Sequence, residues 1–208
     1  EHPRYDAAKA ARYGGEMRRA YQKMDEIVGE AMVRVDGKTL FMVVSDHGFG
    51  TWRASVNYNT WLRQHGYLTL YGDAAGPKNL EDLFDGGEFF ENVDWTRTKA
   101  YALGLGSIYI NVRGREPRGA VEPGEEYEAV RKGIIEGLEA LVDPVTGLRP
   151  VRRVYKREEM YRSFTNDAPD LRASNAPPYR VSWQTSLGSS PADLFEINND
   201  GNWSADHC

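Results

Sequence analysis

The sequence is short of three features that would each point to a class of protein. One cysteine, Cys208, in 208 residues excludes a disulfide within the chain. No apolar run approaches the about 20 residues that a transmembrane helix needs, which predicts a chain without a membrane span. A formal net charge of −5 argues against the clustered Lys and Arg that bind duplex nucleic acid. We therefore expect a soluble protein, with the cytoplasm slightly favoured as its location.

The composition is that of an ordinary globular domain. Hydrophobic residues make up 40% of the chain and charged residues 27%, enough for one α/β domain with a core. The negative net charge does not exclude a small phosphorylated substrate, because bound metal ions can supply positive charge locally. The chain begins at Glu1 and closes on Trp203–Cys208, a cluster of chemically reactive residues rather than a small polar tail. These ends favour an internal piece of a longer protein.

The first secondary structure expected is a helix followed by a buried strand. Apolar residues recur at gaps of three and four between Tyr13 and Val35, which predicts a helix with one buried stripe. Gly37 ends that helix, and the apolar run Leu40–Val44 follows without alternation. Such a run is typical of a parallel strand covered on both faces. Together they form half of a doubly wound unit, whose ligands collect beyond the carboxyl ends of the strands.

The later part of the chain alternates between strand and helix patterns. It also contains a Gly-rich acidic stretch, 72–92, that we expect to be a surface excursion. The expected elements are a short helix over 57–64, a hairpin of 99–103 and 107–112, a helix from Pro123 to Leu141, a turn over 143–147, a strand over 151–155 and a helical turn over 157–161.

Asp46 and His47 follow the expected strand directly and are the strongest candidate metal ligands. Gly48 would allow the backbone to turn sharply, so that both side chains converge on one point. Carboxylate and neutral imidazole together suit zinc and similar divalent ions. The alternative is a capping Asp beside a surface His. The position at the carboxyl end of a buried strand favours the ligand interpretation.

The remaining histidines and cations carry weaker signals. His207 near the chain end is, taken alone, more typical of a surface residue than of a ligand. His65 stands beside Gly66 at the end of a short helix, where the helix dipole favours a cation and capping explains it. Lys99, Arg115 and Arg180 could meet an anionic substrate, although surface ion pairs are the default role of such residues.

Several motifs in order along the chain resemble the alkaline phosphatase superfamily, in particular its type I phosphodiesterase/nucleotide pyrophosphatase branch. They are Thr39–Phe49 with its Ser-Asp-His-Gly-Phe, the run 94–101, Ile108–Asn111 with Gly114–Glu116, Ala168–Leu171 and the closing 203–207. The resemblance implies an alkaline-phosphatase-like α/β core with a mostly parallel sheet flanked by helices. Residues 1–208 would be the C-terminal portion of one such domain. Its core elements would span about 6–50 and 150–208, with 51–149 as an inserted or peripheral segment.

The resemblance also implies metal-dependent hydrolysis of a small phosphorylated substrate. Two divalent metal ions would take part, with zinc expected first and manganese or iron as alternatives. Asp46 and His47 would bind one ion and His207 the other. The family's Ser or Thr nucleophile would lie upstream of residue 1. No catalytic nucleophile is therefore assigned, and the chain alone is expected to be inactive.

Three other functions are compatible with this sequence. A sulfatase or a cofactor-independent phosphomutase could use the same fold, because the nucleophile and the loops decide the substrate class. A degenerate member could also act as a binding domain without catalysis. Upstream sequence lacking a nucleophile and the missing ligands would favour that last alternative. The oligomeric state and the identity of the substrate stay open.

Overall fold

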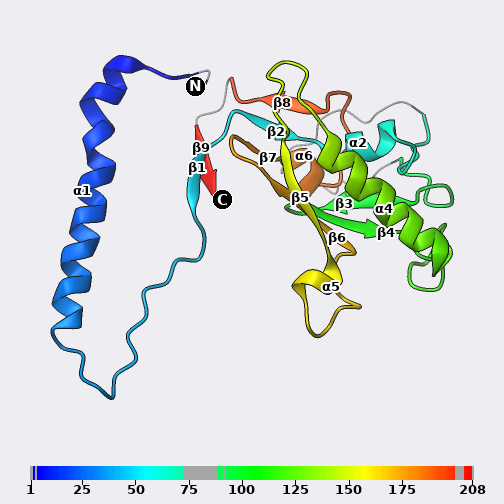
Figure 1. Ribbon diagram of the computed structural model, residues 1–208. Helices are drawn as coiled ribbons and strands as arrows, with labels where there is room; N and C mark the ends of the chain where they lie inside the picture. The colour runs from blue at the N-terminus through cyan, green and yellow to red at the C-terminus, as the bar shows by residue number, and fades with distance from the viewer. Residues whose placement is uncertain (1, 3, 73–88, 91, 200–203, 208) are drawn as a thin grey trace. The chain divides into compact units, whose positions relative to one another are not determined.

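The computed structural model describes residues 2, 4–72, 89–90, 92–199 and 204–207 (Figure 1). The chain divides into two units by its internal contacts. The smaller unit combines Glu1–Thr51 with Asn199–Cys208, and the larger unit is Trp52–Asn198. The prediction of one alkaline-phosphatase-like domain over 1–208 stays a prediction.

The described residues of the smaller unit form one long helix and one pair of strands. Helix α1 (Ala7–Met32) begins at Asp6, whose side chain accepts a hydrogen bond from the Lys9 backbone N–H at 3.0 Å. Strand β1 (Phe49–Thr51) pairs antiparallel with β9 (Ala205–His207), and Figure 1 shows the two side by side. The pairing joins a segment near the start of the chain to one near its end.

The predicted burial of the helical stripe is wrong. The helix expected over 13–35 forms, as α1, but none of its residues is buried. Met17 and Tyr21, for example, are 65% and 73% exposed. A periodic apolar stripe marks the surface that a helix is able to bury, and a second apolar surface must be present before it does so.

The buried strand predicted over Leu40–Val44 is also wrong. These five residues form neither helix nor strand, and their exposure runs from 39% at Phe41 to 82% at Val44. A strand exists only where a neighbour satisfies its backbone N–H and C=O groups, and no described strand pairs with this run. The apolar composition of Leu40–Val44 would suit a buried strand, but these residues are exposed in the described structure.

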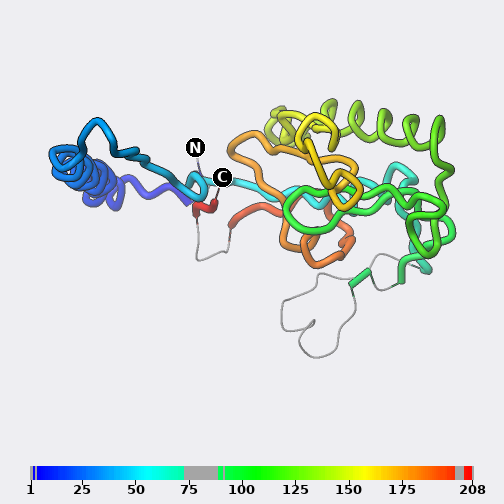
Figure 2. The backbone as a smooth tube through the Cα atoms, turned by 90° about the horizontal axis from the view of Figure 1, so that it is seen from below, coloured from blue at the N-terminus to red at the C-terminus, as the bar shows by residue number. Residues whose placement is uncertain are grey.

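The described residues of the larger unit form two sheets. Four strands lie in the order β3 (Ala100–Leu103), β4 (Ser107–Ile110), β6 (Leu171–Asn175) and β5 (Val151–Lys156). Three lie in the order β7 (Tyr179–Val181), β2 (Ala54–Val56) and β8 (Phe195–Ile197). Helix α4 (Glu125–Ala140) runs along one face of the four-stranded sheet in both views (Figures 1 and 2). The shorter helices among the described residues are α2 (Tyr58–Gln64), α5 (Arg157–Met160) and α6 (Trp183–Ser186).

The core of the larger unit is formed by buried residues of α4, α2 and both sheets. Val130, Ile134 and Leu138 of α4 are buried at the spacing that the sequence predicted. Gly137 lets the helix approach Trp61 closely, because a Cβ atom there would lie 2.6 Å from Trp61 Cζ2. A glycine inside a helix usually costs stability, so close packing explains its presence here.

Most of the local predictions for this unit are confirmed. The hairpin forms as β3 and β4, the helix after Pro123 as α4, and the strand over 151–155 as β5. Strand β6 was not predicted, because its Leu171–Asn175 is largely polar; only Leu171 and Ala173, on alternate positions, are buried. The predicted excursion over 72–92 lies mostly outside the described residues.

The mixed α/β class is confirmed, whereas a mostly parallel sheet is not. Among the described strand pairs only β2–β7 is parallel; the others are antiparallel. The β3–β4 hairpin has a short connection, and short connections join antiparallel neighbours whereas parallel neighbours need a crossover. Within the described residues, no helix is both long and apolar enough to cross a membrane.

Candidate metal centre

The antiparallel pairing of β1 with β9 brings His207 beside His47. Phe49 lies opposite His207 in the register, and the strand β1 begins two residues after His47. The imidazole ring centroids of His47 and His207 are 4.2 Å apart, with the rings edge to face at 72°. The two predicted metal-binding histidines therefore meet in space, although they lie near opposite ends of the chain.

The side chains of Asp46 and His47 also converge. Asp46 Oδ2 lies 3.3 Å from His47 Nε2, and His47 Nδ1 lies 2.9 Å from the Gly48 carbonyl oxygen. A carbonyl can only accept, so Nδ1 carries a proton and donates it. In the neutral ring the lone pair of Nε2 then faces a carboxylate, an arrangement that a proton or a metal ion between them stabilises. The convergence needs no left-handed glycine, because Gly48 has no positive φ.

The distance between these two atoms fits a shared zinc ion. Zinc binds imidazole nitrogen and carboxylate oxygen at about 2.0–2.1 Å in tetrahedral geometry, which places two ligand atoms about 3.3 Å apart. Asp46 Oδ2 and His47 Nε2 are separated by 3.3 Å. Both side chains are open to solvent, Asp46 at 85% and His47 at 41%. The pair can therefore be reached by an ion without rearrangement of a core.

The described residues supply only part of a metal centre. Three His, Cys, Asp or Glu side chains do not converge on one point anywhere within them. Asp46 and His47 could bind one ion and His207 could contribute to a neighbouring one, but further ligands are needed to complete either. Carboxylate and imidazole are ligand types that zinc binds. The described residues provide fewer of them than the three or four protein ligands of a zinc site.

The other candidates from the sequence have structural partners. Lys99 pairs with Glu126 at 3.1 Å, and Arg115 donates to Asp170 at 2.6 Å. The His65 ring lies 4.1 Å from the Trp61 ring, and its Nδ1 lies 2.8 Å from the Trp61 carbonyl oxygen, consistent with the capping interpretation.

Arg180 has an aromatic environment. Its guanidinium lies 3.7 Å from the centre of the Trp52 ring and 5.7 Å from that of Trp183. Burial lowers the pKa of Arg180 from its ordinary value. A guanidinium stacked on indole rings is a common packing arrangement, so this geometry does not by itself indicate a substrate site.

Among the described carboxylates of the larger unit, Asp170 accepts the most hydrogen bonds. The sequence identified it only as part of a motif. It is completely buried and accepts hydrogen bonds from both terminal nitrogens of Arg115, from the Tyr127 hydroxyl and from the Ile110 N–H. Burial opposes its ionisation, but these donors, Arg115 first, outweigh burial and hold the pKa of Asp170 below its ordinary value. Its hydrogen bonds join the residue directly before β6 to β4, to α4 and to Arg115, which is a structural role.

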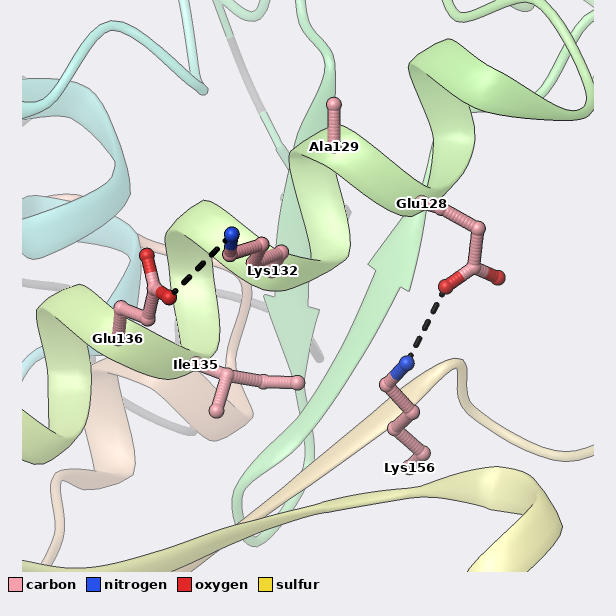
Figure 3. Close-up of a pocket in the computed structure, with 6 residues that line it drawn as sticks. All are labelled: Glu128, Ala129, Lys132, Ile135, Glu136 and Lys156. Atoms are coloured by element: carbon pink, nitrogen blue, oxygen red, sulfur yellow. Dashed lines mark hydrogen bonds and ion pairs between the residues drawn. The ribbon is translucent and has the colours of Figure 1, made fainter.

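A surface hollow of about 340 Å³ lies between α4 and β5 (Figure 3). Each lysine in it pairs with a glutamate: Lys132 with Glu136 at 3.8 Å and Lys156 with Glu128 at 3.2 Å. The charges of these four side chains cancel, so the hollow has no chemical preference for a phosphate. Its lining is Glu128, Ala129, Lys132, Ile135, Glu136 and Lys156.

Comparison with known protein families gives a match over most of the chain. The family model of type I phosphodiesterase / nucleotide pyrophosphatase matches residues 6–188. The match includes Asp46 and His47 and stops before His207. No curated protein and no solved structure matches the chain. Because the matched residues exceed half of its length, the chain belongs to the type I phosphodiesterase/nucleotide pyrophosphatase family, within the alkaline phosphatase superfamily.

Proposed function

We propose that the intact protein hydrolyses phosphate esters with two divalent metal ions, as a phosphodiesterase or nucleotide pyrophosphatase. Membership of the family supports phosphate ester hydrolysis in general. The observation that carries the specific proposal is the contact between His47 and His207, whose ring centroids are 4.2 Å apart. His47 was selected for its position after an apolar run and His207 through the family resemblance, and the β1–β9 pairing brings the two together.

Each of the three predicted ligands has a role in this proposal. Asp46 and His47 would bind one ion through Oδ2 and Nε2, and His207 would bind the second. Paired metal ions in such enzymes lie about 3.5–4 Å apart, so their ligands must be neighbours, as these rings are. Bound ions would polarise the phosphoryl oxygens and stabilise the charge that develops during displacement. Zinc is the first candidate because imidazole and carboxylate suit it, with manganese or iron as alternatives.

The proposal places the nucleophile and the missing ligands outside residues 1–208. The apolar stripe of α1 and the run Leu40–Val44 support this, because both are exposed although their composition is that of buried elements. Additional sequence that covers them would complete an alkaline-phosphatase-like core with the expected parallel strands. The chain by itself would then bind metal weakly and turn over no substrate.

The proposal is tested by hydrolysis of bis(4-nitrophenyl) phosphate by the intact protein. Asp46→Ala, His47→Ala and His207→Ala should each lower kcat/KM at least about 100-fold, since about 3 kcal/mol of metal-dependent stabilisation is removed. His65→Ala is the matched control and should retain activity, because its ring stacks on Trp61. Activity retained in any of the three ligand variants would refute the assignment. Faster turnover of 4-nitrophenyl sulfate would favour the sulfatase alternative.

A further inference from the structure

We infer that Asp206 is a positioning residue that holds the His207 ring with Nε2 directed to a metal ion, and is not itself a ligand. The inference rests on the proposed function. Asp206 Oδ1 accepts a hydrogen bond from His207 Nδ1 at 2.8 Å and from the His207 backbone N–H at 2.9 Å. A carboxylate only accepts, so the ring proton lies on Nδ1 and the lone pair lies on Nε2.

The two adjacent Asp-His pairs of the site use opposite nitrogens. In the first pair, the Asp46 carboxylate lies 3.3 Å from Nε2 of His47, the separation of two ligands on one zinc ion. In the second, Asp206 lies 2.8 Å from Nδ1 of His207, a hydrogen-bond distance. Identical residue order therefore gives a ligand pair at 46–47 and a ligand with its support at 206–207.

Both histidines consequently offer the same atom. The Gly48 carbonyl oxygen accepts a hydrogen bond from Nδ1 of His47 at 2.9 Å, and Asp206 accepts one from Nδ1 of His207. Each ring therefore presents Nε2 as the nitrogen for metal binding. A carboxylate behind an imidazole orients the ring and makes the ligand nitrogen more basic. The exposed fractions agree with a carboxylate that supports the ring from behind, because the Asp206 side chain is 23% exposed and that of His207 is 65% exposed.

The pairing of β9 with β1 also constrains the position of His207. His207 lies opposite Phe49 in the register, and the two ring centroids are 5.9 Å apart. Asp206 lies opposite Gly50, which has no side chain to compete for the carboxylate. The backbone ladder and the Asp206 carboxylate thus constrain His207 together, and removal of the carboxylate should release the ring without unpairing the strands.

The first measurement is the affinity of the intact protein for Zn²⁺, titrated alone by calorimetry. Loss of a group that supports a metal-bound histidine typically costs about 10–100-fold in affinity, which we expect for Asp206→Ala. Asp206→Asn keeps an oxygen that can accept the Nδ1–H, so it should restore part of that loss. Asp25→Asn, on the exposed surface of α1, is the matched control and should bind Zn²⁺ as the parent does.

The second measurement reads the tautomer directly. The chain has four histidines, so selective ¹⁵N labelling gives four ring systems, and His207→Ala identifies the signals of that ring. In the metal-free chain, with the imidazoles neutral, the proton of His207 should reside on Nδ1. In Asp206→Ala it should redistribute towards Nε2, a change that a merely structural role would not produce.

The outcomes separate this inference from the proposed function. If His207→Ala leaves Zn²⁺ affinity unchanged, the proposed function itself fails. If His207→Ala weakens binding but Asp206→Ala does not, only the role of Asp206 is refuted. If Asp206→Asn loses as much affinity as Asp206→Ala and the tautomer of His207 stays the same in both, Asp206 is a metal ligand and the inference is wrong.

Discussion

Replacement of Asp170 by Asn tests the energetic account of the larger unit. The change keeps the shape of the side chain and removes its charge. Asp170 is completely buried and accepts from Arg115 twice, at 2.8 and 2.6 Å, as well as from Tyr127 and the Ile110 N–H, both at 2.7 Å. In Asp170→Asn the amide NH₂ faces donors, so at least one of these hydrogen bonds is lost. Among the described residues, Arg115 then keeps only Glu116, at 3.4 Å, as a carboxylate partner. The 3.3 Å ion pair between Arg157 and Asp170 is also lost.

The expected loss of stability follows from these contacts. Removing one partner of a buried ion pair typically costs about 3–5 kcal/mol. The Arg115 side chain is 29% exposed, so water can resolvate part of its charge. We therefore expect the free energy of unfolding to fall by about 2–4 kcal/mol, which lowers Tm by about 4–16 °C in a protein of this size.

The assay is urea unfolding followed by tryptophan fluorescence, with the midpoint and the slope fitted separately. Asp170→Asn should lower the midpoint with the slope unchanged. Asp167→Asn makes the same chemical change at an exposed position three residues earlier and should cost less than about 0.5 kcal/mol. A loss below about 1 kcal/mol for Asp170→Asn would refute the reasoning.

The pH dependence of unfolding gives a second check on Asp170. The pKa of Asp170 is lowered in the folded protein, so its stabilisation is present above the unfolded pKa of about 3.9. It is lost as the pH falls through the lower folded value. Acidification below about pH 4 should therefore destabilise the parent chain more than Asp170→Asn.

Three further predictions concern packing, exposure and metal. Gly137→Ala should destabilise the larger unit by about 1–3 kcal/mol in urea unfolding, because the new Cβ would lie 2.6 Å from Trp61; an unchanged midpoint would contradict the packing. Ile108→Ala, at a fully buried position, should cost about 2–5 kcal/mol, whereas Val43→Ala, at a position 70% exposed, should cost less than about 0.5 in the same assay. Treatment of the intact protein with a chelator should abolish hydrolysis of bis(4-nitrophenyl) phosphate, and added Zn²⁺ should restore it; activity that survives complete metal removal would contradict the two-metal proposal.

The sequence predicted the elements whose signals are local. Helix α4 carries its start signal at Pro123 and its buried stripe at Val130, Ile134 and Leu138, all within one segment. The β3–β4 hairpin was likewise indicated by Gly104 and Gly106, which separate its two strand patterns. Strand β6 was missed because its pattern is only Leu171 and Ala173 among polar residues. Its place between β4 and β5 depends on partners elsewhere in the chain.

Burial at the N-terminal end could not be predicted in the same way. The stripe of α1 and the run Leu40–Val44 were interpreted correctly as apolar, but burial is a property of a pair of surfaces. The composition of a segment shows only one of these two surfaces. The direction of strand pairing could not be predicted for the same reason. Where two neighbouring strands are not joined by a short loop, their pairing depends on the rest of the fold.

The candidate site was predicted in part from residues and in part from resemblance. Asp46 and His47 were identified by their position after an apolar run. His207 carried little local signal and gained its role from the family motif. The positioning role that we infer for Asp206 does not follow from the sequence, because the order Asp-His does not say which ring nitrogen the carboxylate contacts. Only the contacts in the structure, 3.3 Å to Nε2 in one pair and 2.8 Å to Nδ1 in the other, distinguish the two pairs.

The most direct test of the central claim is the metal content of the intact protein, measured by mass spectrometry after dialysis. Two divalent ions per chain are expected for the parent protein and for His65→Ala, whose ring stacks on Trp61. Asp46→Ala and His47→Ala should each retain about one, because their shared site is lost while that of His207 remains. Two ions retained in both variants, or none in the parent protein, would contradict the account.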